Sequence, residues 1–304
     1  MKTYLALDIG GSGIKCAVMK EDASFVRKFR HELPEDSLSS LIDCVKEIVK
    51  ENSGISGIAI SMPGMIDSKN GFAHTGGILH CVKDVYLAKE LEEVCGLPVT
   101  IENDASCAGM AEVGFGNLSD VEDSVAVILG SGIGGCLIRH RHVETGRHFS
   151  AGEFSYLKMN EKDPYTWNST LDYECGREGL SRLTAKHTGE NREYTGIETF
   201  QMAENGDQNA IRAIDEFSRK LAFALFNIHV VFDCEKIAIG GGISVQPLLI
   251  ESIQRNFQDL YDHLEYPFPQ PEIVPCRFHN DANLIGALYV HLQHGEEHEK
   301  LSIS

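Results

Sequence analysis

One short segment combines the residue types needed to bind a phosphorylated ligand. LALDIGGSGIK, residues 5–15, ends an apolar run at Asp8 and continues through Gly10, Gly11 and Ser12. Glycines let neighbouring backbone amides point the same way and let an anion come close, and the Ser12 hydroxyl adds a donor. A buried carboxylate is costly unless it is paired or lies near a cation, and a Mg²⁺ ion bound to nucleotide phosphates would use Asp8. The segment therefore predicts a phosphate-binding turn, and the alternative is a tight hairpin without a ligand.

The same four letters, GSGI, occur again at 130–133 between two apolar runs. Gly130, Ser131 and Gly132 would form a second turn of this kind, and two such turns can hold a polyphosphate between them. The repetition predicts two lobes that are built on one plan and face each other across a cleft. Gly130, Gly132 and Gly135 also match the dinucleotide pattern G-x-G-x-x-G, but that pattern needs a following helix, and CLI is typical of a strand. The P-loop pattern G-x-x-x-x-G-K-[ST] does not occur in the sequence.

A third glycine turn, Gly240 to Gly242, follows the apolar run KIAI and precedes a helical pattern. Glycines at a strand end let a flat group approach the backbone closely. A nucleotide base and ribose fit that description, so Gly241 and Gly242 are predicted to border an adenosine.

Two carboxylates are candidates for work on a substrate hydroxyl. IENDASC, residues 101–107, places Asn103 and Asp104 at the end of a predicted strand. Asp104 could accept the proton of a hydroxyl as its oxygen attacks a γ-phosphate, and Asn103 could hold another hydroxyl. The alternative is that Asp104 only caps the following helix. Glu153, in the glycine-flanked segment SAGEFSY, is either a second substrate contact or an ordinary surface residue.

Composition narrows the class of protein. The 304 residues carry 27 basic and 45 acidic side chains, a formal charge of −18. Such a surface repels nucleic acid and anionic membranes, so neither is an expected partner. No signal-peptide pattern and no apolar run of membrane-spanning length is present. The nine cysteines are scattered without a CxxC pair, which indicates reduced thiols in the cytoplasm.

Strand and helix patterns alternate along the chain and predict an α/β class. Strands are expected at 3–9, 14–19, 24–31, 57–64 and 98–105. Two more are expected within 124–138 around a glycine turn, and one within 236–244 that runs into a glycine turn. Helices are expected at 39–52, 84–96, 103–116, 207–233, 246–264 and 281–297, whereas 139–205 is irregular. The predicted lobes are residues 1–116 with 283–304, a smaller lobe carrying the first turn and Asp104, and residues 117–282, a larger lobe carrying the other two turns.

In order and spacing together, seven segments resemble the ROK family of sugar kinases and repressors. They are ALDIGGSGIK (6–15), ISMPGMID (60–67), IENDA (101–105), LGSGIGG (129–135), AGEFSY (151–156), IAIGGGIS (237–244) and NLIGALY (283–289). The resemblance covers essentially the whole chain. It implies the two-lobed actin-like, hexokinase-like ATPase fold, an ATP-dependent sugar kinase and a homodimer.

The resemblance also implies roles for individual residues. Asp8 would lie near the Mg²⁺ of ATP, and Asp104 would be the catalytic base. The sugar would contact Asn103, Asp104, Glu153, Tyr156 and the turn at Gly64. The remaining positions would bind ATP: Gly10, Gly11, Ser12 and Lys15 in the first turn, Gly130, Ser131 and Gly132 in the second, and Gly241 and Gly242 beside the adenosine.

One segment departs from the family. Most members carry a structural zinc motif, C-x-C-G-x-x-G-C-x-E, but YECGREGLSR at 173–182 keeps only Cys175 of its cysteines. Tyr156 also stands where the family has a zinc-binding histidine that contacts the sugar near its anomeric end. One thiolate cannot hold a tetrahedral zinc, so no structural zinc is expected. Members without these cysteines that read GEF-x-Y include β-glucoside kinases, and AHTGGILH at 73–80 is also similar to theirs.

The favoured hypothesis is therefore a kinase that phosphorylates the 6-hydroxyl of a hexose or β-glucoside. A glucokinase or an N-acetylmannosamine kinase is the alternative within the class. A sugar-responsive repressor is disfavoured, because the first strand begins near residue 3 and the charge is acidic. A sugar-binding protein without catalysis is disfavoured by Asp8, Asp104 and the three glycine turns. The histidines of the closing helix, His291, His294 and His298, are expected to be solvated.

Overall fold

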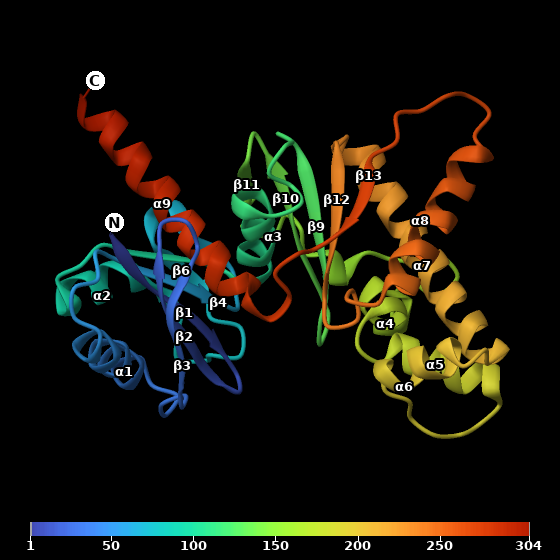
Figure 1. The fold of residues 1–304 in the computed structure, drawn as a ribbon, viewed down its shortest axis with the longest axis horizontal. Helices are drawn as coiled ribbons and strands as arrows, with labels where there is room; N and C mark the ends of the chain where they lie inside the picture. Colours follow the sequence, from blue (N-terminus) through green and yellow to red (C-terminus); the bar gives the residue numbers. More distant parts are fainter. Residues whose placement is uncertain (1, 304) are drawn as a thin grey trace. The chain divides into compact units, whose positions relative to one another are not determined.

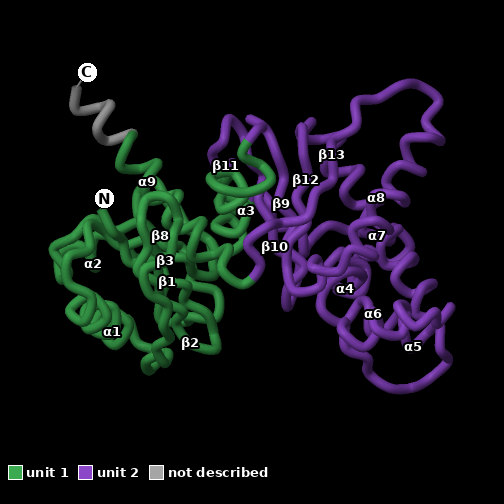
Figure 2. The backbone as a smooth tube through the Cα atoms, in the orientation of Figure 1, with its two compact units in different colours: residues 1–119, 145–150, 280–304 green, residues 120–144, 151–279 purple. Residues whose placement is uncertain are grey.

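The computed structural model describes the backbone of residues 2–303 and the side chains of residues 2–296. The chain divides into two compact units (Figure 2). Unit 1 consists of residues 1–119, 145–150 and 280–304, and unit 2 of residues 120–144 and 151–279. The α/β class is confirmed. Residues 145–150 group with unit 1, although the sequence placed them in the second lobe.

Unit 1 is built on a five-stranded sheet in the order β3-β2-β1-β4-β8 (Figure 1). The strands are β1 (Thr3–Gly10), β2 (Gly13–Lys20), β3 (Phe25–His31), β4 (Ile58–Met62) and β8 (Val99–Asn103). The first three strands are antiparallel neighbours, and β4 and β8 continue the sheet parallel to β1.

Unit 2 repeats this plan in the order β11-β10-β9-β12-β13. Its strands are β9 (Ser124–Leu129), β10 (Ile133–Arg139), β11 (His142–Glu144), β12 (Lys236–Gly241) and β13 (Glu272–Pro275). Strands β9, β10 and β11 are again antiparallel, and β12 and β13 are again parallel to β9. The common plan predicted from the two GSGI segments is therefore present in both sheets.

Alternation along β1 gives the first sheet two different faces. Leu5, Leu7 and Ile9 belong to the core that includes α1 (Leu38–Glu51) and α2 (Leu87–Cys95). Because successive side chains point to opposite faces, Asp8 points to the other side of the sheet. That side is covered by α9 (Ala282–Ile303), against which α3 (Asp104–Phe115) packs.

Small residues let α3 and α9 come very close. A Cβ atom at Gly286 would lie 1.7 Å from the carbonyl oxygen of Cys107. Ala59, Cys107 and Ala287 form the apolar contact at this level.

Unit 1 also contains a small sheet of β5 (Ile66–Asp67), β6 (Phe72–Thr75) and β7 (Lys83–Val85), with a 3-10 turn, η1 (Ser68–Asn70).

Helices of unit 2 pack on one face of its sheet around the long α7 (Gln208–Phe232). The others are α4 (Leu171–Cys175), α5 (Gly179–Thr188), α6 (Gly196–Glu204) and α8 (Pro247–Asp262), with the 3-10 turns η2 (Phe154–Tyr156) and η3 (Trp167–Ser169). A further 3-10 turn, η4 (His279–Asp281), lies where the chain passes from unit 2 back to unit 1. Helices α4, α5 and α6 fall in the stretch that the sequence left irregular. They are short, and glycines lie at their ends, so each has too few turns to show a clear apolar periodicity.

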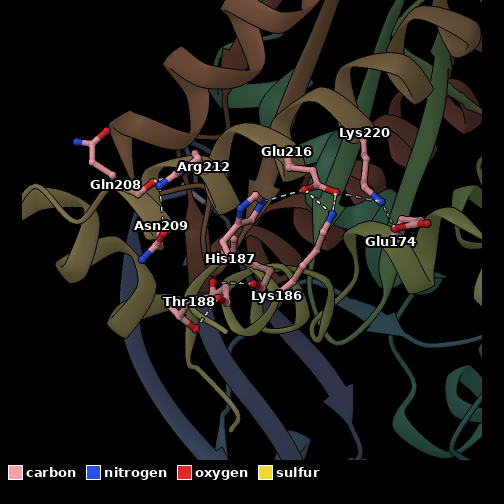
Figure 3. A network of polar contacts seen from close by, with 11 residues as sticks. Glu174, Lys186, His187, Thr188, Gln208, Asn209, Arg212, Glu216 and Lys220 are labelled. Carbon is pink, nitrogen blue, oxygen red and sulfur yellow. Dashed lines mark hydrogen bonds and ion pairs between the residues drawn. The ribbon is translucent and has the colours of Figure 1, made fainter. Parts of the chain in front are cut away.

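An ion-pair network holds α4 and α5 against α7 (Figure 3). Glu216 of α7 accepts from Lys186 Nζ at 2.8 Å and lies 2.9 Å from His187 Nε2, and both partners come from α5. Lys220, one turn further along α7, pairs with Glu174 of α4 at 2.5 Å. The network fixes the two short helices that follow the segment 151–170.

The expectation of solvated histidines in the closing helix is wrong for His291. Its ring is buried, lies 3.1 Å from Thr100 Oγ1 and meets the Tyr4 ring edge-on at 5.4 Å. Helix α9 lies across the sheet at this point, which sequence periodicity does not reveal. His298 falls outside the residues whose side chains are described. Among the described helices, none has the length and apolarity to span a membrane.

Candidate functional site

Asp8 lies at the end of β1 with both carboxylate oxygens engaged. Its Oδ2 accepts from Lys15 Nζ at 2.9 Å, and its Oδ1 accepts from Ser61 Oγ at 3.1 Å and from Asn283 Nδ2 at 3.0 Å. The side chain is only 10% exposed, so the Lys15 charge offsets much of the cost of burying it. Adjacent strands β2 and β4 and helix α9 thus aim three donors at one carboxylate. Asp8 and Lys15 were predicted from the sequence, whereas Ser61 and Asn283 were not, because their contacts with Asp8 depend on the pairing of β4 with β1 and on the packing of α9.

The first glycine turn directly follows Asp8. Gly10 and Gly13 face each other as the last pair of the β1–β2 ladder, so Gly11 and Ser12 form the exposed tip. Gly13 has a φ of 128°, a conformation that favours glycine. The tip presents backbone amides and one hydroxyl to solvent beside a carboxylate and a lysine, as a phosphate-binding turn requires.

Asn103 and Asp104 stand where β8 passes into α3. Asn103 caps the helix, its Oδ1 accepting from the amides of Ala105 at 2.9 Å and Ser106 at 3.1 Å. Its Nδ2 donates to the carbonyl oxygen of Gly64 at 3.0 Å, which ties two predicted sugar-binding positions together. Asp104 is the first residue of α3, so Asn103 and not Asp104 is the cap, and the alternative role considered for Asp104 belongs to its neighbour.

Glu102 precedes this pair and is buried. Its Oε1 accepts from the amide of Asn103 at 2.7 Å. Burial raises the pKa of Glu102 from an ordinary 4.5 to about 7, the hydrogen bond from the Asn103 amide opposes the rise, and the Asp67 charge adds to it. No role was predicted for Glu102 from the sequence, since only the fold buries its side chain.

Stability should reflect this titration. Between pH 4.5 and pH 7 the folded protein retains a proton on Glu102 that the unfolded chain releases, so the free energy of unfolding falls as the pH rises through this window. The fall is at most about 1.4 kcal/mol per pH unit. Glu102→Gln keeps an acceptor for the Asn103 amide and cannot ionise. We expect its stability relative to the wild type, measured by urea unfolding at pH 5, 6 and 7, to increase with pH; a constant difference would contradict the assignment.

The second glycine turn is held by a carboxylate that the sequence did not identify. Gly130 N donates to Gly132 O at 3.0 Å across the turn, and the amide of Ile133 donates to Asp172 Oδ1 at 3.0 Å. A Cβ atom at Gly132 would lie 2.7 Å from the same oxygen, which explains the glycine. Asp172 lies on α4, far along the chain, and no sequence signal links it to the turn.

A cavity of about 330 Å³ opens beside this turn within unit 2. It is lined by Leu129, Gly130, Ser131, Cys175, Gly176, Arg177, Leu180, Gly196, Gly242 and Ile243. Gly241, adjacent to Gly242, has a φ of 98°, and a Cβ atom there would lie 2.1 Å from the Leu129 carbonyl oxygen. The cavity thus joins the second and third glycine turns, and its size and glycine walls fit a base and ribose. The walls from α4, α5 and α6 were not predicted.

Glu153 and Tyr156 bracket η2 in unit 2. Glu153 is exposed, and Phe154 next to it is buried against β10, where a Cβ atom at Gly135 would lie 2.5 Å from its ring. Tyr156 is exposed. The burial of Phe154 therefore anchors a turn that presents both predicted substrate residues to solvent.

Cys175, the one remaining cysteine of the zinc motif, is buried, and burial raises the pKa of its thiol. Its Sγ lies 3.9 Å from the Phe217 carbonyl oxygen. Arg182 stacks over the Tyr173 ring at 3.7 Å and donates to the Tyr173 carbonyl. Within residues 2–296, no cluster of histidine, cysteine and carboxylate side chains has the arrangement of a metal site. The absence of a structural zinc stays a prediction.

Comparisons with known proteins agree on one family. The model of the ROK family matches residues 4–294. A β-glucoside kinase of Listeria monocytogenes is 32% identical over 300 residues, covering 97% of this chain and 99% of that protein. An N-acetyl-D-glucosamine kinase of Photobacterium profundum is 29% identical, with coverage of 95% and 99%.

Among solved structures, a ROK family protein of Streptococcus pneumoniae in complex with sucrose has a TM-score of 0.86 at 30% identity, with coverage of 97% of this chain and 99% of that one. The match extends over both units, and the seven segments quoted from the sequence lie within the matched residues. The chain belongs to the ROK family.

Proposed function

We infer that the chain is an ATP-dependent carbohydrate kinase, and we propose that its acceptor is the 6-hydroxyl of a β-glucoside. The observation that carries the proposal is the arrangement at the start of α3. Asn103 is fixed by the helix amides and by Gly64, and the adjacent Asp104 carboxylate begins the helix. A carboxylate fixed in this way beside a hydrogen-bonding amide suits a sugar whose hydroxyl must be deprotonated.

In the proposed reaction, Asp104 accepts the proton of the 6-hydroxyl while the hydroxyl oxygen attacks the γ-phosphorus. The bond between the γ-phosphorus and the β–γ bridging oxygen breaks, and ADP leaves. In this proposal the phosphate-binding groups are the turn of Gly10, Gly11 and Ser12 and the turn of Gly130, Ser131 and Gly132. Their amides bind the phosphates and stabilise the charge that develops on them.

Asp8 is the residue that would hold Mg²⁺. A single carboxylate surrounded by Lys15, Ser61 and Asn283 fits an ion that keeps most of its water and binds mainly to phosphates. The ion would neutralise phosphate charge during transfer. Lys15 and the hydroxyl and amide donors hold the Asp8 carboxylate in position, and Gly241 and Gly242 leave room for the adenosine.

The choice of a β-glucoside rests on the substrate segment and on the relatives. Tyr156 occupies the position of the family's zinc-binding histidine, and Cys175 has no zinc partners among the described residues. Three relatives named β-glucoside kinase are 30–32% identical to this chain, including the enzyme from Klebsiella pneumoniae. An N-acetylmannosamine kinase or a glucokinase remains the second candidate, and a neighbour described as a putative N-acetylmannosamine kinase is 30% identical.

The direct test is ADP formation across a panel of glucose, N-acetylmannosamine, N-acetylglucosamine, fructose, cellobiose, gentiobiose and an aryl β-glucoside. Turnover of the β-glucosides with little turnover of glucose is expected. Preference for a free monosaccharide would support the kinase activity but refute the proposal that the acceptor is a β-glucoside. No turnover with any sugar, together with measurable sugar binding, would favour a non-catalytic sugar-binding protein.

We also propose that the enzyme is a cytoplasmic homodimer. All nine cysteines are free, as expected in a reducing compartment. On α7, Phe223, Val230 and Val231 are exposed at spacings that place them along one side of the helix. Such an apolar strip is typical of a subunit interface.

The dimer can be tested by placing a charge on this strip. Val231 is 88% exposed, so Val231→Glu should not disturb the folded monomer. We expect sedimentation velocity to give twice the chain mass for the wild type and a monomer for the variant, because an unpaired buried carboxylate is costly in an interface. Val26→Glu, at an exposed apolar residue of β3 in unit 1, is the control that should stay dimeric. A monomeric wild type would refute the proposal.

A further inference from the structure

Two aromatic side chains of unit 2 form an exposed pair that the reaction above does not use. The Tyr156 side chain is 64% exposed, and Trp167 is 49% exposed. Their rings meet edge to face, with centroids 5.5 Å apart and an interplanar angle of 90°. Tyrosine and tryptophan are enriched at binding interfaces, because each combines a large apolar ring with a polar group. Tyr156 is the last residue of the short turn η2, and Glu153 directly precedes that turn.

The pair is built on a closed and hydrogen-bonded loop. Met159 N donates to Ser169 O at 2.6 Å, and Leu171 N donates to Leu157 O at 2.8 Å, so the chain after Tyr156 is joined to the chain after Trp167. The Thr170 hydroxyl donates to the Trp167 carbonyl oxygen at 2.7 Å. These bonds hold the backbone beneath both rings, which lowers the ordering cost of binding a ligand on them.

Asp172 fixes the indole itself. Trp167 Nε1 donates to Asp172 Oδ2 at 3.2 Å, while Asp172 Oδ1 accepts from the Ile133 amide of the second phosphate turn at 3.0 Å. Ser155 Oγ lies 3.5 Å from the same Oδ1 and donates to the Ile133 carbonyl at 2.8 Å. One carboxylate therefore orients the exposed tryptophan and supports the turn predicted to bind phosphate.

We propose that Tyr156 and Trp167 form the subsite for the group attached to the anomeric oxygen, a second sugar ring or an aryl ring, and that Asp172 is its positioning residue. The inference rests on the proposed function, since Tyr156 belongs to the substrate segment. A pyranose ring has apolar C–H faces and an aryl ring is apolar throughout, so both can pack on an exposed indole and phenol. Free glucose has only a hydroxyl at this position and gains nothing from the pair.

The chain offers an unusually clean reporter, because Trp167 is its only tryptophan. All indole emission therefore comes from the proposed subsite. We expect cellobiose, added without ATP, to shift Trp167 emission to shorter wavelength and to protect it from acrylamide quenching in a saturable way. Saturating glucose should leave Trp167 emission almost as easily quenched by acrylamide as in the free protein. Equal protection by both sugars, or none by cellobiose, would overturn the proposal.

Kinetics give a second and independent readout. Trp167→Ala should lower kcat/KM for cellobiose on the order of ten- to a hundredfold and leave kcat/KM for glucose and the KM for ATP within about twofold. Trp167→Phe keeps a ring and should recover most of the loss. Tyr165→Ala is the matched control, because Tyr165 lies on the same loop and is 95% exposed. A uniform loss for both sugars in Trp167→Ala would indicate a merely structural role.

Asp172→Asn separates positioning from packing. An asparagine has one oxygen that can accept a hydrogen bond. It therefore cannot accept both from Trp167 Nε1 and from the Ile133 amide, as the two oxygens of Asp172 do. We expect a larger KM for cellobiose and a larger KM for ATP together, and Trp167 emission that is more easily quenched before any ligand is added. Unchanged quenching would refute the positioning role.

Failure of this inference and failure of the proposed function are distinguishable. Suppose that the wild type phosphorylates cellobiose, but cellobiose does not protect Trp167 from quenching and Trp167→Ala does not lower kcat/KM for cellobiose. The proposed kinase activity is then supported and the proposed subsite is refuted. If the wild type phosphorylates no sugar, the proposed function is refuted. The change in Trp167 emission on addition of cellobiose then still tests whether the subsite binds the disaccharide.

Discussion

Asp104→Asn should reduce kcat by about 10²–10⁴-fold, the usual contribution of a positioned general base. The side chain keeps its size and loses the ability to take a proton. Asp104 Oδ1 accepts from the Ala105 amide at 2.8 Å, and an asparagine oxygen can accept the same bond, so the start of α3 should persist. The KM for the sugar should change little, because Asn103 and Gly64 keep their contact.

The measurement is steady-state turnover with the best sugar of the panel, combined with thermal unfolding to verify the fold. Asp207→Asn is the matched control, because Asp207 caps α7 and has no predicted role in catalysis. It should retain nearly full activity. Near-normal turnover by Asp104→Asn would refute the assignment of the base.

Gly64→Ala should damage both the fold and sugar recognition. Gly64 has a φ of 114°, and a Cβ atom there would lie 2.0 Å from the Thr75 carbonyl oxygen. The backbone cannot yield without moving the turn that accepts from Asn103 Nδ2. We expect the free energy of unfolding to fall by about 3 kcal/mol, and kcat/KM for the sugar to fall about 100-fold, since small displacements of positioning groups are costly.

Gly54→Ala provides the control for backbone strain alone. Gly54 has a φ of 84°, and a Cβ atom there would meet nothing within 4 Å. This variant should lose only about 1–2 kcal/mol and keep its kinetics. If the two variants behave alike in urea unfolding and in turnover, the overlap of a Cβ atom at Gly64 with the Thr75 carbonyl oxygen does not affect stability or sugar recognition.

Sequence reasoning succeeded best where chemistry is local. The first and second glycine turns, the strands before them and the Asn103–Asp104 pair each depend on a few consecutive residues, and the structure places them at strand ends as predicted. A common plan for the two lobes was also predicted from one repeated tetrapeptide, whereas the matching strand order of the two sheets is visible only in the structure. Local signals suffice here because hairpins and helix starts form from neighbouring residues.

Errors and omissions came from contacts between distant segments. His291 was expected to be solvated and is buried against Thr100 and Tyr4, because α9 returns to the first sheet. Helices α4 to α6 were left irregular, since each is too short to display its own periodicity. Glu102 titrates near neutral pH only because the fold removes it from water.

The sequence by itself determined the α/β class, the glycine turns and the residue types that suit phosphate transfer to a sugar, because these follow from spacing and side-chain chemistry. Only the tertiary structure decided which distant side chains hydrogen-bond to these turns and to Asp8. Asn283 reaches Asp8 across 275 positions of the chain, and Asp172 reaches Ile133 across 39. Both contacts follow from helices docking on sheets, where burial of apolar faces sets the partners, and no local pattern encodes that choice.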